Sequence, residues 1–88
     1  SSDAFIEKSI IGDGSEIYGK VYNSVIGSGV VIEEGAVVRD SIIMQDTVIG
    51  KKCSISSVIT DKNVEIGDEK IMTGSASYPL YIGKNAVI

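Results

Sequence analysis

Aliphatic residues recur along the chain at intervals of five or six positions, with polar residues and glycines between them. Such self-similarity is the first feature to test, because a fixed period indicates a repeat architecture. Three five-residue segments align at equal spacing, and two six-residue units follow each one. These segments are Val21–Val25, Val38–Ile42 and Ile55–Ile59. The repeat is therefore five plus six plus six residues.

Each six-residue unit begins with a lead residue, usually aliphatic, and has a small or β-branched residue four positions later. Ile26 leads to Val30, and Ile49 leads to Cys53. We expect the leading aliphatic side chain to point inward and the smaller one to let the chain turn inside a narrow three-sided prism. Glycine, asparagine and aspartate gather between the units, where tight corners require left-handed backbone angles. An earlier, shorter coil, residues 6–20, reads five plus six plus four.

The choice of aliphatic residues favours strands over helices. The chain holds fifteen Ile and ten Val against one Leu, and β-branched side chains suit a pleated surface. No window shows an apolar stripe at helical spacing. We therefore predict an all-β fold: a single-stranded left-handed parallel β-helix of hexapeptide repeats, about five coils tall, forming one domain over residues 1–88.

One segment, residues 72–81, departs from the period and contains the only proline. We predict that it is a loop extruded from one corner, after which the repeat resumes at Ile82. Its aromatic and apolar residues are a possible subunit or domain contact, because exposed apolar patches mark such surfaces. The alternative is that the loop packs against the flank of its own rod. The candidate contact residues are Tyr78, Pro79, Leu80 and Tyr81.

Length, charge and cysteine content narrow the class of protein. Eighty-eight residues make one small domain, and twelve acidic against eight basic residues argue against a nucleic-acid partner. The apolar runs are too short to span a membrane, and no signal peptide is visible. A lone Cys53 fits a cytoplasmic location. The chain opens with Ser1-Ser2-Asp3 and no Met, so we expect that it was cut from a longer protein.

The chain offers little chemistry of its own. Left-handed hexapeptide helices often belong to acyltransferases, which need a His as general base, and a related carbonic anhydrase type binds zinc with three His. This chain has no His. Cys53 occupies a small-residue position of the repeat, so we interpret it as a core residue, with Lys51 and Lys52 on the corner. We expect no catalytic, cofactor-binding or metal-binding residue in this fragment.

The stretch from Ala4 to Gly67 contains sequence motifs that are more specific than the general hexapeptide pattern. They lie at residues 4–12, 21–27 and 37–45, and the last is continued by residues 47–50. On these motifs the chain resembles the C-terminal β-helix of bacterial glucose-1-phosphate adenylyltransferase, also called ADP-glucose pyrophosphorylase. The resemblance covers about three quarters of the chain and is weakest over residues 70–81.

The resemblance implies a parent enzyme that makes ADP-glucose and pyrophosphate from ATP and glucose 1-phosphate for glycogen or starch synthesis. In that family the ATP and Mg²⁺ sites lie in an N-terminal catalytic domain. The β-helix joins subunits into a homo- or heterotetramer and contributes to allosteric control. The expected partners are therefore the chain's own catalytic domain and other subunits, with no nucleic acid and no membrane. No catalytic residue is carried over.

Two alternatives remain open at the level of the sequence. The chain could be the domain of a hexapeptide acyltransferase, against which the missing His argues. It could also be the same β-helix on another sugar-1-phosphate nucleotidyltransferase. The resemblance does not separate a catalytic subunit from a regulatory sister subunit.

Overall fold

The computed structural model describes residues 4–88, which form fourteen strands and no helix. The opening Ser1-Ser2-Asp3 segment of the predicted 1–88 domain lies outside the described residues. All strand pairs between named strands are parallel, and the strands fall into three sheets. The predicted all-β class and the parallel β-helix are confirmed.

Successive strands pass from one sheet to the next, so each sheet receives every third strand. Sheet 1 contains β1 (Phe5–Glu7), β4 (Lys20–Tyr22), β7 (Val37–Arg39), β10 (Ser54–Ser56) and β13 (Ile71–Thr73). Sheet 2 contains β2 (Ile10–Ile11), β5 (Val25–Ile26), β8 (Ile42–Ile43), β11 (Val58–Thr60) and β14 (Leu80–Ile82). Sheet 3 contains β3 (Glu16–Ile17), β6 (Val31–Ile32), β9 (Val48–Ile49) and β12 (Glu65–Ile66).

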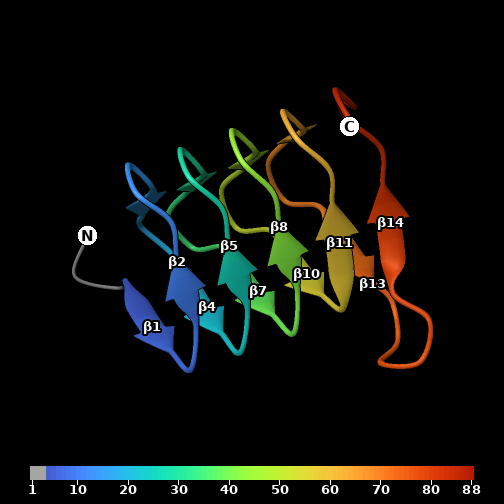
Figure 1. The fold of residues 1–88 in the computed structure, drawn as a ribbon, viewed down its shortest axis with the longest axis horizontal. Coiled ribbons are helices and arrows are strands. Elements are labelled where there is room, and N and C mark those ends of the chain that lie inside the picture. The colour runs from blue at the N-terminus through green and yellow to red at the C-terminus, as the bar shows by residue number, and fades with distance from the viewer. Residues whose placement is uncertain (1–3) are drawn as a thin grey trace.

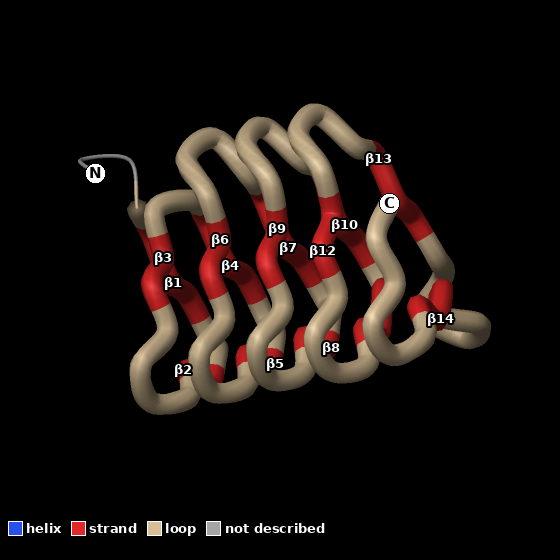
Figure 2. Tube along the Cα trace, turned by 90° about the horizontal axis from the view of Figure 1, so that it is seen from above, coloured by secondary structure: helices blue, strands red, loops and turns tan. Residues whose placement is uncertain are grey.

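The coil is left-handed. In Figure 1 the chain rises through sheet 2 at the front, descends through sheet 1 behind it, and advances from the N-terminus at the left to the C-terminus at the right. Four coils have all three strands, and β13, β14 and a bridge between Glu65 and Val87 form a fifth. Figure 2 shows the coils side by side from above, with the segment before β14 projecting beyond the stack.

The strand register reproduces the period expected from the sequence. Val21 pairs with Val38, and Val38 pairs with Ile55, so each step between coils is one full repeat. The first coil is two residues shorter, so Ile6 pairs with Val21. The five plus six plus six repeat and its shorter first coil are both confirmed.

The interior contains the side chains from two positions of each six-residue unit, the leading aliphatic residue and the smaller residue four positions later. Ile26, Ile32 and Ile49 are at most 1% exposed, as expected for inward-pointing side chains. Cys53 is 1% exposed, and its thiol donates a hydrogen bond to the Gly67 carbonyl oxygen over 3.0 Å. The remaining buried apolar residues are Val21, Val30, Ala36, Val38, Ile43, Ile55, Val58, Val64, Ile66 and Ile82.

A ladder of three serines ties the first corner of successive coils together. Ser9, Ser24 and Ser41 each donate their hydroxyl proton to the carbonyl oxygen two residues earlier, over 2.7–2.8 Å. Each hydroxyl oxygen also accepts the backbone N–H of the residue stacked on it in the next coil, over 3.0–3.1 Å. In the last step of this serine ladder, the Ser41 hydroxyl oxygen accepts the N–H of Val58.

The three corners explain where glycine, asparagine and aspartate fall in the sequence. Twelve corners each contain one residue with a positive φ, and eight of these twelve residues are Gly, Asn or Asp, which tolerate it best. The corner before sheet 2, which we call the leading corner, uses Lys8, Asn23, Asp40 and Ser57. The corner after sheet 2, the trailing corner, uses Gly14, Gly29, Asp46, Asn63 and Asn85. The third uses Gly35, Lys52 and Glu69.

The segment predicted as a loop over residues 72–81 is shorter in the structure. Its first two residues belong to β13 and its last two to β14, so residues 74–79 form the connection. Thr60 pairs with Ile82, whereas the regular repeat would have paired it with Ser77. The connection therefore carries a five-residue insertion, which we call the inserted loop, and the stack continues beyond it in register.

Candidate functional site

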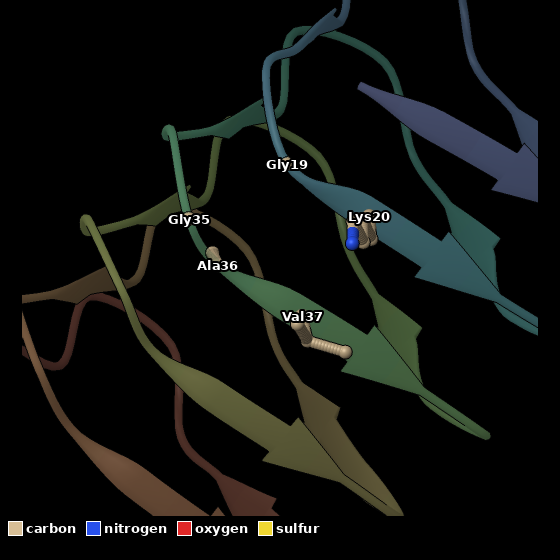
Figure 3. Close-up of a pocket in the computed structure, with 5 residues that line it drawn as sticks. All are labelled: Gly19, Lys20, Gly35, Ala36 and Val37. Atoms are coloured by element: carbon tan, nitrogen blue, oxygen red, sulfur yellow. The ribbon is translucent and has the colours of Figure 1, made fainter. Parts of the chain in front are cut away.

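A shallow hollow lies at the corner between β3 and β4. Only two residues link these strands, whereas four link β6 and β7, so the first coil leaves a space there. The space measures about 270 Å³ and is lined by Gly19, Lys20, Gly35, Ala36 and Val37. In Figure 3 Lys20 and Val37 stand on neighbouring strands, with the two glycines at the corner. One cation without a nucleophile or an acid–base partner does not form a catalytic centre.

The titratable residues are dispersed over the corners and the outer faces of the strands. Among residues 4–88 no three His, Cys, Asp or Glu side chains converge to hold a metal ion. Cys53 lies inside the prism, while Lys51 and Lys52 are exposed on the corner, as expected from the repeat. A reactive thiol needs an accessible, electropositive setting, which a buried core position does not supply. Nor do residues 4–88 contain a helix long and apolar enough to cross a membrane.

The outer face of sheet 2 carries a continuous line of apolar side chains, one from each coil. Ile10, Val25 and Ile42 follow one another in register on β2, β5 and β8, and Ile59 and Tyr81 continue the line on β11 and β14. Four of the five are exposed: Ile10 69%, Val25 43%, Ile42 43% and Tyr81 58%. We call this line the apolar row. Contiguous exposed apolar surface of this kind marks an interaction site.

Sequence reasoning missed most of the apolar row, although a signal for it was present. In three coils two aliphatic residues stand side by side, as in Ile10-Ile11, Val25-Ile26 and Ile42-Ile43. Successive side chains of a strand point to opposite faces, so only one residue of each pair points inward. The other residue must lie on the outer face. Repetition of the pair at the same place in each coil predicts a row.

The four residues predicted as a contact fall in different places. Tyr81 joins the apolar row, whereas Leu80 pairs with the buried Val58 and is 38% exposed. Tyr78 is 85% exposed in the inserted loop, where its backbone exchanges two hydrogen bonds with Ser75. Pro79 lines a groove beside the row. The structure therefore brings Tyr81 and Pro79 to the flank and leaves Tyr78 at the loop.

The groove lies between the apolar row and the inserted loop. Its volume is about 510 Å³, and it contains Val25 and Ile42 from sheet 2 together with Ser75, Ala76 and Pro79 from the loop. The groove and the row are continuous because they share Val25 and Ile42. The candidate functional site is consequently an apolar flank and its border rather than a catalytic pocket.

A short hydrogen bond fixes the aromatic end of the apolar row. The Tyr81 hydroxyl donates to Asp61 Oδ2 over 2.6 Å, and the N–H of Lys62 donates to Asp61 Oδ1 over 2.7 Å. The bond from Tyr81 lowers the pKa of the Asp61 carboxyl, with the Lys62 N–H adding to the effect. The same bond raises the pKa of the Tyr81 hydroxyl. Tyr81 is thereby held as a fixed, exposed aromatic ring, a side chain that often anchors interfaces.

Sheet 1 carries a second, smaller cluster of outward side chains. The rings of Phe5 and Tyr22 lie with their centroids 5.7 Å apart, and Arg39 Cζ lies 4.3 Å from the centroid of the Tyr22 ring. The Tyr22 ring therefore makes an aromatic contact with Phe5 and a cation–π contact with Arg39. They cover the N-terminal half of this sheet and leave no continuous row across its coils.

Comparisons with known proteins agree with the resemblance drawn from the sequence motifs. The family described as GlmU-like, C-terminal hexapeptide, matches residues 1–76. The glucose-1-phosphate adenylyltransferase of Lachnospira eligens is 79% identical over 34 residues, and that of Thermosipho melanesiensis is 53% identical over 34 residues. Each match covers 39% of this chain and 8% of the relative. The chain thus corresponds to a small part of these relatives.

Proposed function

The chain belongs to the GlmU-like, C-terminal hexapeptide family, and from that premise we propose that it is the non-catalytic assembly and regulatory domain of a sugar-phosphate nucleotidyltransferase. The similarity to two glucose-1-phosphate adenylyltransferases supports the conversion of ATP and glucose 1-phosphate to ADP-glucose and pyrophosphate as the parent activity. In this proposal ATP and Mg²⁺ bind to a separate N-terminal catalytic domain. The parent protein works in the cytoplasm as a homo- or hetero-oligomer.

The observation that carries the assembly role is the apolar row. Five side chains from five successive coils form one line on sheet 2, and four of them are exposed. Water contact with such a surface is unfavourable by about 25 cal/mol per Å² of apolar area, so covering it favours association. The inward residues of the prism, by contrast, are buried against one another. The outer face is therefore the part of the domain available for contacts.

Regulation follows from assembly in this proposal. The serine ladder links successive coils by hydrogen bonds, so in this proposal the rod holds the subunits in a defined arrangement. Any ligand that favours one arrangement of subunits then changes the catalytic domains attached to them. The chain's contribution is positional, and its own residues hold no substrate.

Acyl transfer is the competing function, and a direct assay separates the two. We expect no turnover when the chain is incubated with acetyl-coenzyme A and amino sugars. Hexapeptide acyltransferases use a His as general base, and this sequence contains no His. Acyl transfer above the uncatalysed rate would replace the assembly role. Assay of the longer parent protein with several sugar 1-phosphates and nucleoside triphosphates tests the nucleotidyltransferase activity and its specificity.

The assembly role itself is tested by static light scattering over a range of protein concentrations. We expect the mass to rise above the 9.3 kDa of one chain as the concentration increases. A circular dichroism spectrum of β-structure at each concentration shows that the associating species is folded. A folded chain that stays at the mass of a monomer at the highest concentration would contradict the proposal.

A further inference from the structure

We propose that Met44 is a redox-sensitive modification site, and that its oxidation to methionine sulfoxide weakens the association made by the apolar row. This inference rests on the proposed assembly function. It adds a means of regulation: the row associates while the Met44 thioether is reduced and separates when the sulfur carries an oxygen.

Met44 occupies a position on sheet 2 that three other coils leave without a side chain. The register places Met44 in line with Gly12, Gly27 and Gly83, and with Asp61 in the fourth coil. A Cβ atom on Gly12 or Gly27 would lie 2.6–2.8 Å from backbone atoms of the next coil, so the first two coils exclude one. Closure of a coil therefore does not require a side chain at this position.

The third coil has room for the methionine. The N–H of Met44 donates to the Thr60 carbonyl oxygen over 3.3 Å, whereas the equivalent bonds from Gly12 and Gly27 measure 2.7 and 2.8 Å. The longer hydrogen bond indicates a wider step to the next coil at this point. Met44 is partly exposed there.

Met44 borders the centre of the apolar row. It lines a hollow of about 360 Å³ together with Val25 and Ile42 of the row and with Lys62 of the trailing corner. Ile42 is the third of the five row residues, and two residues of extended chain separate it from Met44 by about 6–7 Å. A partner that covers Ile42 with a standard interface of about 800 Å² per side therefore covers Met44 as well.

The other sulfur-containing side chains point away from this face. The second methionine of the sequence, Met72, pairs in register with the buried Ile55 and packs against the core. The Cys53 side chain lies inside the prism and is 1% exposed. Oxidation of sulfur follows its exposure. Met44 is consequently the sulfur that a peroxide meets on the outer face of sheet 2.

The oxidation is balanced with hydrogen peroxide as the oxidant. A lone pair of Met44 Sδ attacks one peroxide oxygen, the O–O bond breaks, and the departing hydroxide takes the remaining proton and leaves as water. The sulfur loses two electrons and the peroxide gains them. The product replaces an apolar thioether with a polar sulfoxide. Burial of that oxygen against aliphatic side chains without a donor is unfavourable, so oxidation favours the separated, hydrated surface.

Oxidation of a chain with a single methionine tests the site. In a Met72→Leu background, hydrogen peroxide is added until mass spectrometry of peptides shows one oxygen on Met44. Sedimentation equilibrium before and after the treatment measures self-association. We expect the dissociation constant to rise about tenfold or more, as for an acceptor buried without a partner. Met44→Gln, which carries a carbonyl oxygen on a chain of similar length, should weaken association without any oxidant.

Two control variants separate this site from a general effect of peroxide. Met44→Leu in the same background lacks the sulfur and should associate equally with and without peroxide. Adding Ile71→Met to that variant places a methionine on the outer face of sheet 1, at a position that is 79% exposed. Its oxidation should leave association unchanged. Circular dichroism shows whether each oxidised chain is folded.

Three results would overturn the inference. If the oxidised chain is folded and associates as strongly as the reduced chain, Met44 does not regulate the row and the assembly function stands. If oxidation of Met44 unfolds the chain, Met44 belongs to the core rather than to the surface. If the reduced chain never associates, the assembly function itself is wrong and the inference falls with it.

Discussion

Each inward position of this coil selects a side chain by shape. A three-sided prism with sides of two or three residues leaves room for one β-branched or small side chain at each inward place. Ile32 and Ile49 stack in register on sheet 3 and are both fully buried. Burial of an Ile side chain stabilises the fold by about 1.5–3 kcal/mol. Polar residues occupy inward positions where their side chains make hydrogen bonds. Thr60 Oγ1, for example, accepts the N–H of Met44 over 3.2 Å.

Replacing Ile49 with Asp is expected to unfold the chain. The side chain is fully buried among aliphatic neighbours, and an unpaired buried charge costs several kcal/mol, which is comparable with the whole stability of a small domain. Urea denaturation followed by circular dichroism measures the effect. Ile42→Asp in the same coil is the control, because Ile42 points outward and is 43% exposed. Equal stability of the two variants would show that the inward face is wrongly assigned.

Replacing Ser41 with Ala removes a buried link of the serine ladder. The hydroxyl is the acceptor for the Val58 N–H, so its loss leaves a buried donor unsatisfied at a cost of about 1–3 kcal/mol. We predict a decrease of that size in the free energy of unfolding. Ser54→Ala, an exposed position on β10, should change it by less than about 0.5 kcal/mol. If the serine ladder does not stabilise the fold, Ser41→Ala and Ser54→Ala will have the same free energy of unfolding.

The Tyr81–Asp61 bond predicts a pH dependence in acid, where Asp61 titrates, and a second one in alkali, where the Tyr81 hydroxyl with its raised pKa titrates. The pKa of Asp61 in the folded chain lies below its ordinary value of 3.8, because the hydrogen bond from Tyr81 favours the carboxylate. The stabilising contribution is therefore present above pH 3.8 and is lost as the pH falls through the lowered pKa. NMR titration of the Asp61 carboxyl should show the value rise in Tyr81→Phe. Tyr18→Phe should leave it unchanged, since the Tyr18 hydroxyl bonds to Glu16.

At the level of the strands and corners, the period and the corner residues could be predicted from the sequence. The constant repeat fixes which residues stack, and all three Asn and three of the ten Gly adopt the expected positive φ. Lys8, Lys52, Ser57 and Glu69 adopt it as well, which their residue types do not indicate. The ends of the inserted loop could be predicted only in part. Met72 follows Ile55 at the regular step, so β13 is readable from the period. The start of β14 depends on the length of the insertion, which no local pattern encodes.

Deleting residues 75–79 tests the interpretation of the inserted loop. The deletion joins Gly74 to Leu80 and restores the regular step between Thr60 and Ile82. Glycine can adopt the positive φ that Ser57 uses at the same corner one coil earlier. We expect the β-structure to persist and the free energy of unfolding to change by less than about 1 kcal/mol. Deleting residues 61–65, an equal number within a regular coil, should unfold the chain.

On the scale of the whole molecule, one flank differs from the other two. Sheet 3 places Glu16 and Glu65 at the ends of its outward line, and sheet 1 interrupts its outward residues with Lys20 and Ser54. Sheet 2 alone among the described strands has an outward line without charge, from Ile10 to Tyr81. The sequence shows the aliphatic pairs that form this line, but only the closed coil shows that they align. The partner of the flank is a property of the assembly and leaves no local motif.

The central claim is that the apolar row makes this domain an assembly module. Sedimentation equilibrium of the wild-type chain and of Ile42→Asp tests it most directly. Ile71→Asp, on the exposed outer face of sheet 1 and 79% exposed, is the matched control. We predict self-association of the wild type and of Ile71→Asp, and loss of association in a folded Ile42→Asp. A wild-type chain that remains monomeric, or an Ile42→Asp variant that associates as strongly as the wild type, would contradict it.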